Sequence, residues 1–467
     1  MKRFRLDRVA IAGLALAAVG VAMRVNNAVR YPPRWGFDAM FNERYVRRLM
    51  ESWALPAPDA DWSTAHPPLY YYLSAAVGRI LDHGDSLMTI VPTRLVGTLA
   101  GLATIALAVA LVRRVDPERP RRALLAAALL LFLPVHIYMS AMLNEEILAS
   151  AFVSAALVAT AWPLARRDRD RDWLRAAGIG LAAGLALLTK LSGLLVAIAA
   201  ALSYGIEGLY RRRFLAALRC AALVGGVALL VGGWYYLRNL AVYGYLYPQD
   251  LTTHSVMFEM PPGARSIGDY FRVPLATWTD PQPLAPDLLR SIWGATYVSA
   301  WYEGHGHFLP AGNPAAKRMG TLILVLALLP TAAFAAGIGR GVRRALGAPD
   351  GPDTPLLCLV ILTLAGYVAF TWSNPWFATV KASYLLGLSV PFAFYASEAL
   401  ASWTEGRGVG ALCVWGGLAA LLLAVCTTFT YGLGLWELTG PGILPGLDWS
   451  SAAPVVPESI APPAEMP

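Results

Sequence analysis

The stretch VPTRLVGTLAGLATIALAVALVRR, residues 91–114, decides the fold class of this chain. Residues 95–112 carry no charged side chain, and the basic pair Arg113-Arg114 follows at once. Because a helix needs about 20 mostly apolar residues to cross the hydrocarbon core of a bilayer, the stretch predicts a transmembrane helix. The two arginines predict that this helix ends at the cytoplasmic face.

The same pattern recurs along most of the chain. Of the 467 residues, 57% are hydrophobic and only 15% are charged, whereas soluble domains carry about 25% charged residues. The sequence therefore predicts an all-α integral membrane protein, a polytopic bundle of about eleven transmembrane helices. The predicted helices cover residues 8–25, 91–112, 122–140, 146–165, 173–189, 191–209, 215–237, 319–339, 355–372, 382–400 and 409–431.

Short basic gaps between these segments set the predicted topology. With the N-terminus inside, every arginine run falls on the cytoplasmic side, as the positive-inside rule requires. The net charge of +8 then reflects topology, and the position of these arginines argues against nucleic-acid binding. The basic groups are Arg113-Arg114, Arg121-Arg122, Arg166-Arg167, Arg211-Arg212-Arg213 and the cluster of Arg340, Arg343 and Arg344.

Three segments face outward from a transmembrane domain that spans residues 1–431. They are a first outer loop at 26–90, a large outer loop at 238–318 and a Pro-rich tail at 432–467. All four cysteines lie in apolar segments, so no disulfide framework is expected. In the first loop, Ala39 to Trp53 predicts an amphipathic helix that lies in the plane of the membrane interface.

Asp38, directly before this amphipathic helix, is the first candidate for chemistry. It is interpreted either as a helix N-cap that accepts a bond from an early amide or as a general base at the membrane boundary. His66 and Tyr70 follow in His66-Pro67-Pro68-Leu69-Tyr70-Tyr71-Tyr72. This motif is either a structural turn rich in interfacial aromatics or a contact for substrate or metal.

A third candidate is the acidic pair Glu145 and Glu146, in a very short outer turn after Asn144. These carboxylates either favour the N-terminus of the next helix through its dipole or belong to an active site. Cations at outer helix ends form the fourth group: Lys190, Arg238 and Lys381. They either extend toward lipid headgroups or bind a phosphate.

Nucleotide chemistry finds no support in the sequence. It contains no Gly-rich phosphate loop, no pair of zinc ligands at helical spacing and no nucleophile elbow. A nucleotide-sugar donor is therefore not expected.

These motifs all fall on the predicted outer side of the membrane, and their order along the chain resembles that of the type C (GT-C) membrane glycosyltransferases. The likeness is strongest to the branch of protein O-mannosyltransferases and the lipid A aminoarabinose transferase. It extends over roughly residues 8–400. The motifs that carry it, besides Asp38 and the His66 to Tyr71 stretch, are Ser140–Glu146, Leu188–Gly193, Trp234–Asn239 and Lys381–Leu386, which includes Tyr384.

The resemblance implies an inverting transfer from a polyprenyl-phosphate sugar, with Asp38 in the position of the base. From their positions in these outer segments, we expect six further residues to bind the substrate: His66, Tyr70, Lys190, Arg238, Lys381 and Tyr384. The family's second acid is commonly Asp, whereas this chain offers Glu145 or Glu146, so the role of that acid and of a possible divalent metal stays open. The acceptor is a glycan, a lipid or a protein, and the expected location is the inner membrane of a bacterium with the site facing the periplasm.

One carboxylate base beside several cations suffices for this chemistry, because a phosphate leaving group needs charge neutralisation rather than a proton. A permease or lipid flippase is the alternative, since transporters place charged groups near the bilayer midplane. Most candidates here gather at one face instead, and Glu398, near a cytoplasmic helix end, is the main exception. An oligosaccharide ligase or polymerase is a third reading with the same donor class.

Overall fold

The computed structural model describes residues 8–32, 35–81, 90–162, 172–247, 264–309, 313–375, 379–406 and 408–433. Within these ranges helices are the only regular elements, so the predicted all-α class is confirmed. The predicted Pro-rich tail, from residue 434 onward, lies outside the described residues.

The long apolar segments form the predicted membrane helices. Nine helical segments of the described chain are long and apolar enough to cross a membrane, and the bent pair α5–α6 makes a tenth. The eleventh, α7, is apolar but only 16 residues long. The bounds are α1 (Arg8–Arg30), α4 (Ile90–Val115), α5 (Pro120–Leu131), α6 (Pro134–Ala141), α7 (Glu146–Ala161), α8 (Asp172–Thr189), η3 (Leu191–Gly193), α9 (Leu194–Tyr210), α10 (Phe214–Ala228), η4 (Leu229–Gly233), α11 (Trp234–Tyr243), α16 (Pro314–Leu326), α17 (Leu328–Gly347), α18 (Asp353–Ser373), η7 (Ala382–Leu388), α19 (Ser389–Trp403) and α20 (Val409–Phe429).

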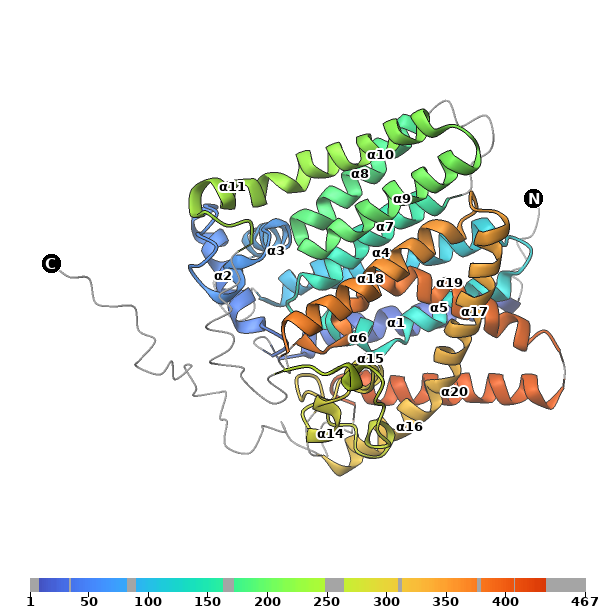
Figure 1. The fold of residues 1–467 in the computed structure, drawn as a ribbon. Helices are drawn as coiled ribbons and strands as arrows, with labels where there is room; N and C mark the ends of the chain where they lie inside the picture. Colours follow the sequence, from blue (N-terminus) through green and yellow to red (C-terminus); the bar gives the residue numbers. More distant parts are fainter. Residues whose placement is uncertain are drawn as a thin grey trace, which may run out of the picture.

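The two long predicted loops contain short helices. The first loop holds α2 (Ala39–Ser52), η1 (Trp62–Ala65) and α3 (Leu69–Ile80). The second holds η5 (Ile267–Tyr270), α13 (Ala276–Thr279), α14 (Pro286–Leu289) and α15 (Ile292–Trp301). α2, α3 and the end of α11 gather at one end of the bundle, here called the site end, and the α9–α10 and α17–α18 turns lie at the opposite end (Figure 1).

The amphipathic helix was predicted correctly, but its apolar face is covered by protein. Tyr45 and Leu49 are fully buried, and the ring of Tyr45 stacks on Tyr71 of α3 with centroids 4.1 Å apart. The periodic apolar side chains of α2 therefore pack against α3, and that packing, rather than insertion into lipid, accounts for their pattern.

A buried arginine stabilises the break between α5 and α6, where the helix axis bends by 52°. Pro134 starts α6, so the last carbonyls of α5 lack helical partners. Arg24 of α1 is 1% exposed, and its guanidinium donates to the carbonyls of Leu131 at 2.6 Å and Leu130 at 3.0 Å. This bond set fixes the direction of α6, which leads into the acidic turn before α7.

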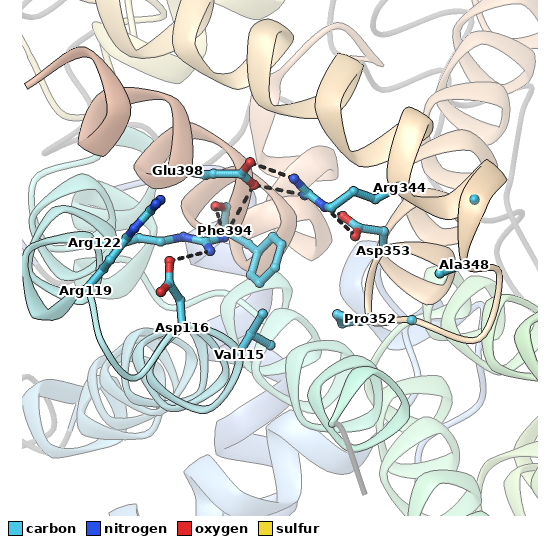
Figure 2. Close-up of a pocket in the computed structure, with 12 residues that line it drawn as sticks. Val115, Asp116, Arg119, Arg122, Arg344, Ala348, Pro352, Asp353, Phe394 and Glu398 are labelled. Carbon is cyan, nitrogen blue, oxygen red and sulfur yellow. Dashed lines mark hydrogen bonds and ion pairs between the residues drawn. The ribbon is translucent and has the colours of Figure 1, made fainter. Parts of the chain in front are cut away.

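At the opposite end, a network of ion pairs joins four helices and the α4–α5 turn. Arg344 of α17 makes paired bonds to Asp353 of α18 at 2.8 Å and to Glu398 of α19 at 2.6 and 2.9 Å. Arg122 of α5 lies 3.6 Å from Glu398 and 3.2 Å from Asp116. Figure 2 shows these side chains around a cavity of about 630 Å³. Glu398, the charged residue that favoured a transporter, is thus held by arginines.

Candidate active site

The acidic turn before α7 is organised by its own polar groups. The Asn144 side chain accepts the backbone N–H of Glu146 at 2.7 Å, and the backbone N–H of Asn144 donates to the hydroxyl of Tyr70 at 2.9 Å. Tyr70 is fully buried. Its hydroxyl therefore supports the turn from α3, and Glu145 and Glu146 are held side by side at the start of α7.

Both carboxylates bind one lysine. Lys190 lies in extended conformation between α8 and η3, and its Nζ is 3.0 Å from Glu145 Oε1 and 2.6 Å from Glu146 Oε1. Burial opposes ionisation of Glu145, but Lys190 and His66 outweigh it and lower the pKa from 4.5 to about 2. Glu145 is thus ionised, and Lys190 is already paired with both carboxylates.

One atom of this group has no partner. Glu146 Oε2 is buried and makes no hydrogen bond to any residue that the structure describes. An unpaired buried carboxylate oxygen is costly unless a ligand or water binds it. The acidic turn therefore has one acceptor available for substrate.

Three polar side chains connect the turn to the first loop. His66 Nδ1 is 3.0 Å from the Tyr71 hydroxyl, which in turn lies 2.9 Å from Asn42 Oδ1 and 3.4 Å from Glu145 Oε2. Asn42 of α2 also donates to the carbonyl of Leu143 at 2.8 Å. The Tyr71 hydroxyl thus reaches Glu145, whereas the hydroxyl of Tyr70, the predicted substrate contact, accepts the Asn144 amide.

Asp38 occupies the N-cap position of α2, but the capping interpretation is wrong. Its backbone is left-handed with φ 54°, and its side chain makes no capping hydrogen bond. Instead Oδ1 accepts the indole N–H of Trp62 at 3.2 Å, and Oδ2 makes no hydrogen bond to the described residues. The α2 amides therefore do not use this carboxylate, which leaves it available to a ligand.

Lys381 is a buried cation without a counter-ion contact. It precedes η7 and is 7% exposed, and within the described chain it makes no side-chain hydrogen bond and no ion pair. Its Nζ lies 4.5 Å from the ring centre of Phe37 and 5.2 Å from that of Tyr384. Lys190 Nζ is also 5.2 Å from the Tyr384 ring, so this ring joins the two lysines.

Burial opposes protonation of Lys381, but Tyr384, Asp38 and Glu146 outweigh it and raise its pKa. The ammonium is therefore charged and near the Asp38 and Glu146 carboxylates without bonding to either. A buried charge with unused donors is an anion-binding group.

Arg238 is the predicted cation that the structure does not bring into this cluster. On α11 it bonds to its neighbours Asn239 at 3.3 Å and Tyr243 at 3.4 Å. Its guanidinium also lies over the Tyr243 ring, 5.4 Å from the centre. Arg238 therefore lies at the margin of the site.

The sequence analysis missed a loop after α15, with sequence Glu303-Gly304-His305-Gly306-His307-Phe308. The rings of His305 and His307 contact the ring of Phe37, the neighbour of Asp38, at centroid distances of 5.4 and 4.6 Å. The available signal was two of the six histidines within three residues, separated by a glycine, in a predicted outer loop.

A divalent metal stays a prediction. Within the part of the chain that the structure describes, no three His, Cys, Asp or Glu side chains are arranged to hold a metal ion.

Part of the chain that contains this site matches a known protein family. Residues 65–236 match the family model of dolichyl-phosphate-mannose-protein mannosyltransferase. That segment includes the His66 motif, the acidic turn and Lys190, and it ends before Arg238. No curated protein sequence matches the chain.

Solved structures give the fold. ArnT from Cupriavidus metallidurans bound to undecaprenyl phosphate superposes with a TM-score of 0.55 at 17% identity, over 91% of this chain and 77% of that one. The oligosaccharyltransferase of Archaeoglobus fulgidus in complex with Zn and sulfate gives 0.53 at 17% identity, over 90% of this chain and 53% of the other. The chain has the fold of a type C membrane glycosyltransferase. The predicted resemblance is thereby confirmed, and the protein is multi-pass in the membrane.

Within this type C fold, the described residues that form the site come from distant parts of the sequence. Asp38 comes from the first loop, Glu145 and Glu146 from the α6–α7 turn, Lys190 from the α8–η3 break and Lys381 from the start of η7. Each lies at an interruption between helices. Such interruptions free backbone and side-chain groups that a continuous helix would keep occupied.

Proposed function

We propose that this protein is an inverting glycosyltransferase that moves a sugar from a polyprenyl-phosphate donor to an acceptor. The observation that carries the proposal is that Lys381, a buried ammonium with unused donors, lies near Asp38, a carboxylate that no helix amide uses. A lipid phosphate supplies the anion that Lys381 lacks. The acceptor hydroxyl supplies the proton that a base removes.

In the proposed reaction, Asp38 takes the proton of the acceptor hydroxyl as that oxygen bonds to the anomeric carbon. The bond between this carbon and the phosphate oxygen breaks at the same time, and its electron pair leaves with the polyprenyl phosphate. Lys381 stabilises the negative charge that develops on the leaving phosphate. One displacement with one base inverts the anomeric centre, without the nucleophilic carboxylate that retention requires.

Glu145, Glu146 and Lys190 take a supporting role in this scheme. Their ion pairs hold the α6–α7 turn against the α8–η3 break, and Tyr384 lies between Lys190 and Lys381. Glu146 Oε2, which has no partner in the described structure, is the atom that accepts a hydrogen bond from a substrate hydroxyl. His66 and Tyr71 position Glu145 through their shared hydrogen bonds.

The similar proteins support the donor class. ArnT was solved with undecaprenyl phosphate bound, and the matching family model is that of a dolichyl-phosphate-mannose-dependent enzyme. Undecaprenyl phosphate and dolichyl phosphate are both polyprenyl phosphates. We extend that class to this chain, with a glycan, lipid or protein as acceptor.

The proposed orientation puts the site end outside a bacterial inner membrane. Its support is the basic opposite end, which contains the turn with Arg211, Arg212 and Arg213 and the Arg344 network. In a cysteine-free background, Asp59→Cys in the first loop should react with a membrane-impermeant maleimide in intact cells. Leu346→Cys, exposed at the end of α17, should react only after permeabilisation, and the reverse pattern would place the site in the cytosol.

Reconstitution tests the proposed reaction. The purified chain in vesicles is supplied with a panel of undecaprenyl-phosphate sugars, and release of undecaprenyl phosphate is followed with candidate acceptors. Sugar transfer with inversion supports the proposal. Movement of the lipid across the vesicle membrane without cleavage would instead favour the flippase alternative.

A further inference from the structure

The loop after α15 is built around a buried carboxylate. Glu303 is fully buried and has φ 79°, and Gly304 and Gly306 are also left-handed, with φ 71° and 84°. The Glu303 carboxylate accepts backbone N–H bonds of 3.1 to 3.5 Å from five residues that follow it: His305, Gly306, His307, Phe308 and Leu309. Burial raises the pKa of Glu303 to about 7 against the effect of these amides. So many bonds to one side chain fix the loop in a single shape.

That shape presents two imidazoles to the Asp38 region. Their rings meet Phe37 edge-on, and the same Phe37 ring lies under the ammonium of Lys381. The charges of both Asp38 and Lys381 act on His307. The imidazoles therefore lie beside Asp38, the proposed base, and Lys381, which we propose binds the phosphate.

Both histidines are neutral at physiological pH. Burial and the neighbouring positive charge lower the pKa of His305 to about 3 and that of His307 to about 4. His305 Nδ1 is 3.0 Å from the carbonyl oxygen of Glu303, which only accepts, so this nitrogen carries the proton. His305 Nε2 is left as an acceptor, and neither ring nitrogen of His307 bonds to the described residues.

We infer that His305 and His307 form the binding site for hydroxyl groups of the donor's sugar ring. This inference rests on the proposed function. Neutral imidazoles hydrogen-bond to hydroxyls without competing with Lys381 for the phosphate. In an inverting displacement the sugar lies between the leaving phosphate and the base. His307 is close enough to Lys381 and to Asp38 for the charges of both to act on its imidazole, so this ring lies where the sugar is expected.

Binding measurements separate the sugar from the phosphate. The purified full chain is titrated with undecaprenyl phosphate and with the undecaprenyl-phosphate sugar that it transfers. His305→Ala and His307→Ala should each weaken binding of the sugar-bearing lipid about 3- to 10-fold, the size of one hydrogen bond. Binding of the bare lipid should stay within about 2-fold of wild type, and the loop variant Gln282→Ala should change neither.

Donors that lack one sugar hydroxyl complete the test. One deoxy donor should lack the hydroxyl that a histidine of this loop binds, and the wild type should bind that donor more weakly than the complete donor. The histidine variant should bind this deoxy donor no more weakly than the wild type does, because the effects of two groups that contact each other are non-additive. His307→Gln, which keeps hydrogen-bonding capacity, should restore part of the affinity. Thermal melting confirms that each variant is folded.

Two results would overturn the inference. One is an equal loss of affinity for both lipids in the histidine variants, which would make the loop a structural support or a phosphate-binding site. The other is unchanged binding of the sugar-bearing lipid. If the wild type binds and transfers no undecaprenyl-phosphate sugar, the proposed function itself fails, and that outcome is visible before any histidine is replaced.

Discussion

The ammonium of Lys381 lies 4.5 Å from the centre of the Phe37 ring. This contact brings the start of η7 against the first loop, although most of the chain separates the two residues in sequence. The ring holds Lys381 beside Asp38 without giving it a negatively charged partner, because a cation is attracted to an aromatic face. Asp38, the proposed base, and Lys381, which we propose binds the phosphate, therefore lie close together while both remain available to the substrate.

Asp38→Asn is expected to abolish transfer while the protein stays folded. The amide keeps the shape and tolerates the left-handed backbone, but it cannot accept a proton from the acceptor. Base catalysis contributes about 10²- to 10⁴-fold, so the rate in the vesicle assay should fall at least 100-fold. Asp59→Asn, an exposed carboxylate of the same loop, is the matched control, and a residual rate above about a tenth would remove Asp38 as the base.

Lys381→Ala is expected to weaken binding of undecaprenyl phosphate. A charged hydrogen bond to phosphate contributes about 1.5–3 kcal/mol, which corresponds to about 10- to 150-fold in Kd. Lys317→Ala, whose lysine pairs with Asp280 at 2.7 Å, should leave binding unchanged. Arg238→Ala compares a cation at the margin of the site, and a loss as large as that of Lys381→Ala would move the phosphate toward α11.

Glu145 should stabilise the fold over the whole neutral range. Its pKa lies below the ordinary value of 4.5 because of Lys190 and His66, so the folded state favours the ionised form. The free energy of unfolding lost in Glu145→Gln should be constant from pH 5 to 8. It should shrink only below about pH 4.5, where the wild type's carboxylate is protonated on unfolding. Denaturant unfolding at several pH values measures this difference, and a change centred near pH 7 would contradict the ion-pair assignment.

Glu398→Gln should lower stability without changing donor affinity. The substitution weakens the bonds to Arg344 and Arg122 at the end away from the site, and losing buried charged bonds costs about 1–3 kcal/mol. Glu405→Gln, from an exposed pair with Arg119 at 3.7 Å, should cost less than about 1 kcal/mol. A changed Kd for undecaprenyl phosphate in Glu398→Gln would link the two ends and strengthen the transport alternative.

The helices and their order were predictable from the sequence because apolar length alone defines a membrane span. The sequence predicted one continuous helix over 122–140, whereas the structure has a break between Leu131 and Pro134. The break is stable because Arg24 binds the carbonyls that Pro134 frees, and this contact between distant residues leaves no mark in the local sequence. The pairing of Lys190 with Glu145 and Glu146 depends on packing between helices that are adjacent only in space. The role of the Glu303 loop depends on left-handed backbone and on contacts with Phe37, neither of which leaves a periodic pattern.

The left-handed backbone at Asp38 restricts this position independently of its chemistry. Residues with bulky or branched side chains are strained at φ 54°, whereas Gly, Asn and Asp adopt that conformation readily. Two separate requirements therefore act on one residue: a side chain compatible with the turn into α2, and a carboxylate that accepts a proton. Asparagine meets the first requirement and fails the second, so it is the substitution that tells a folding defect from a chemical one.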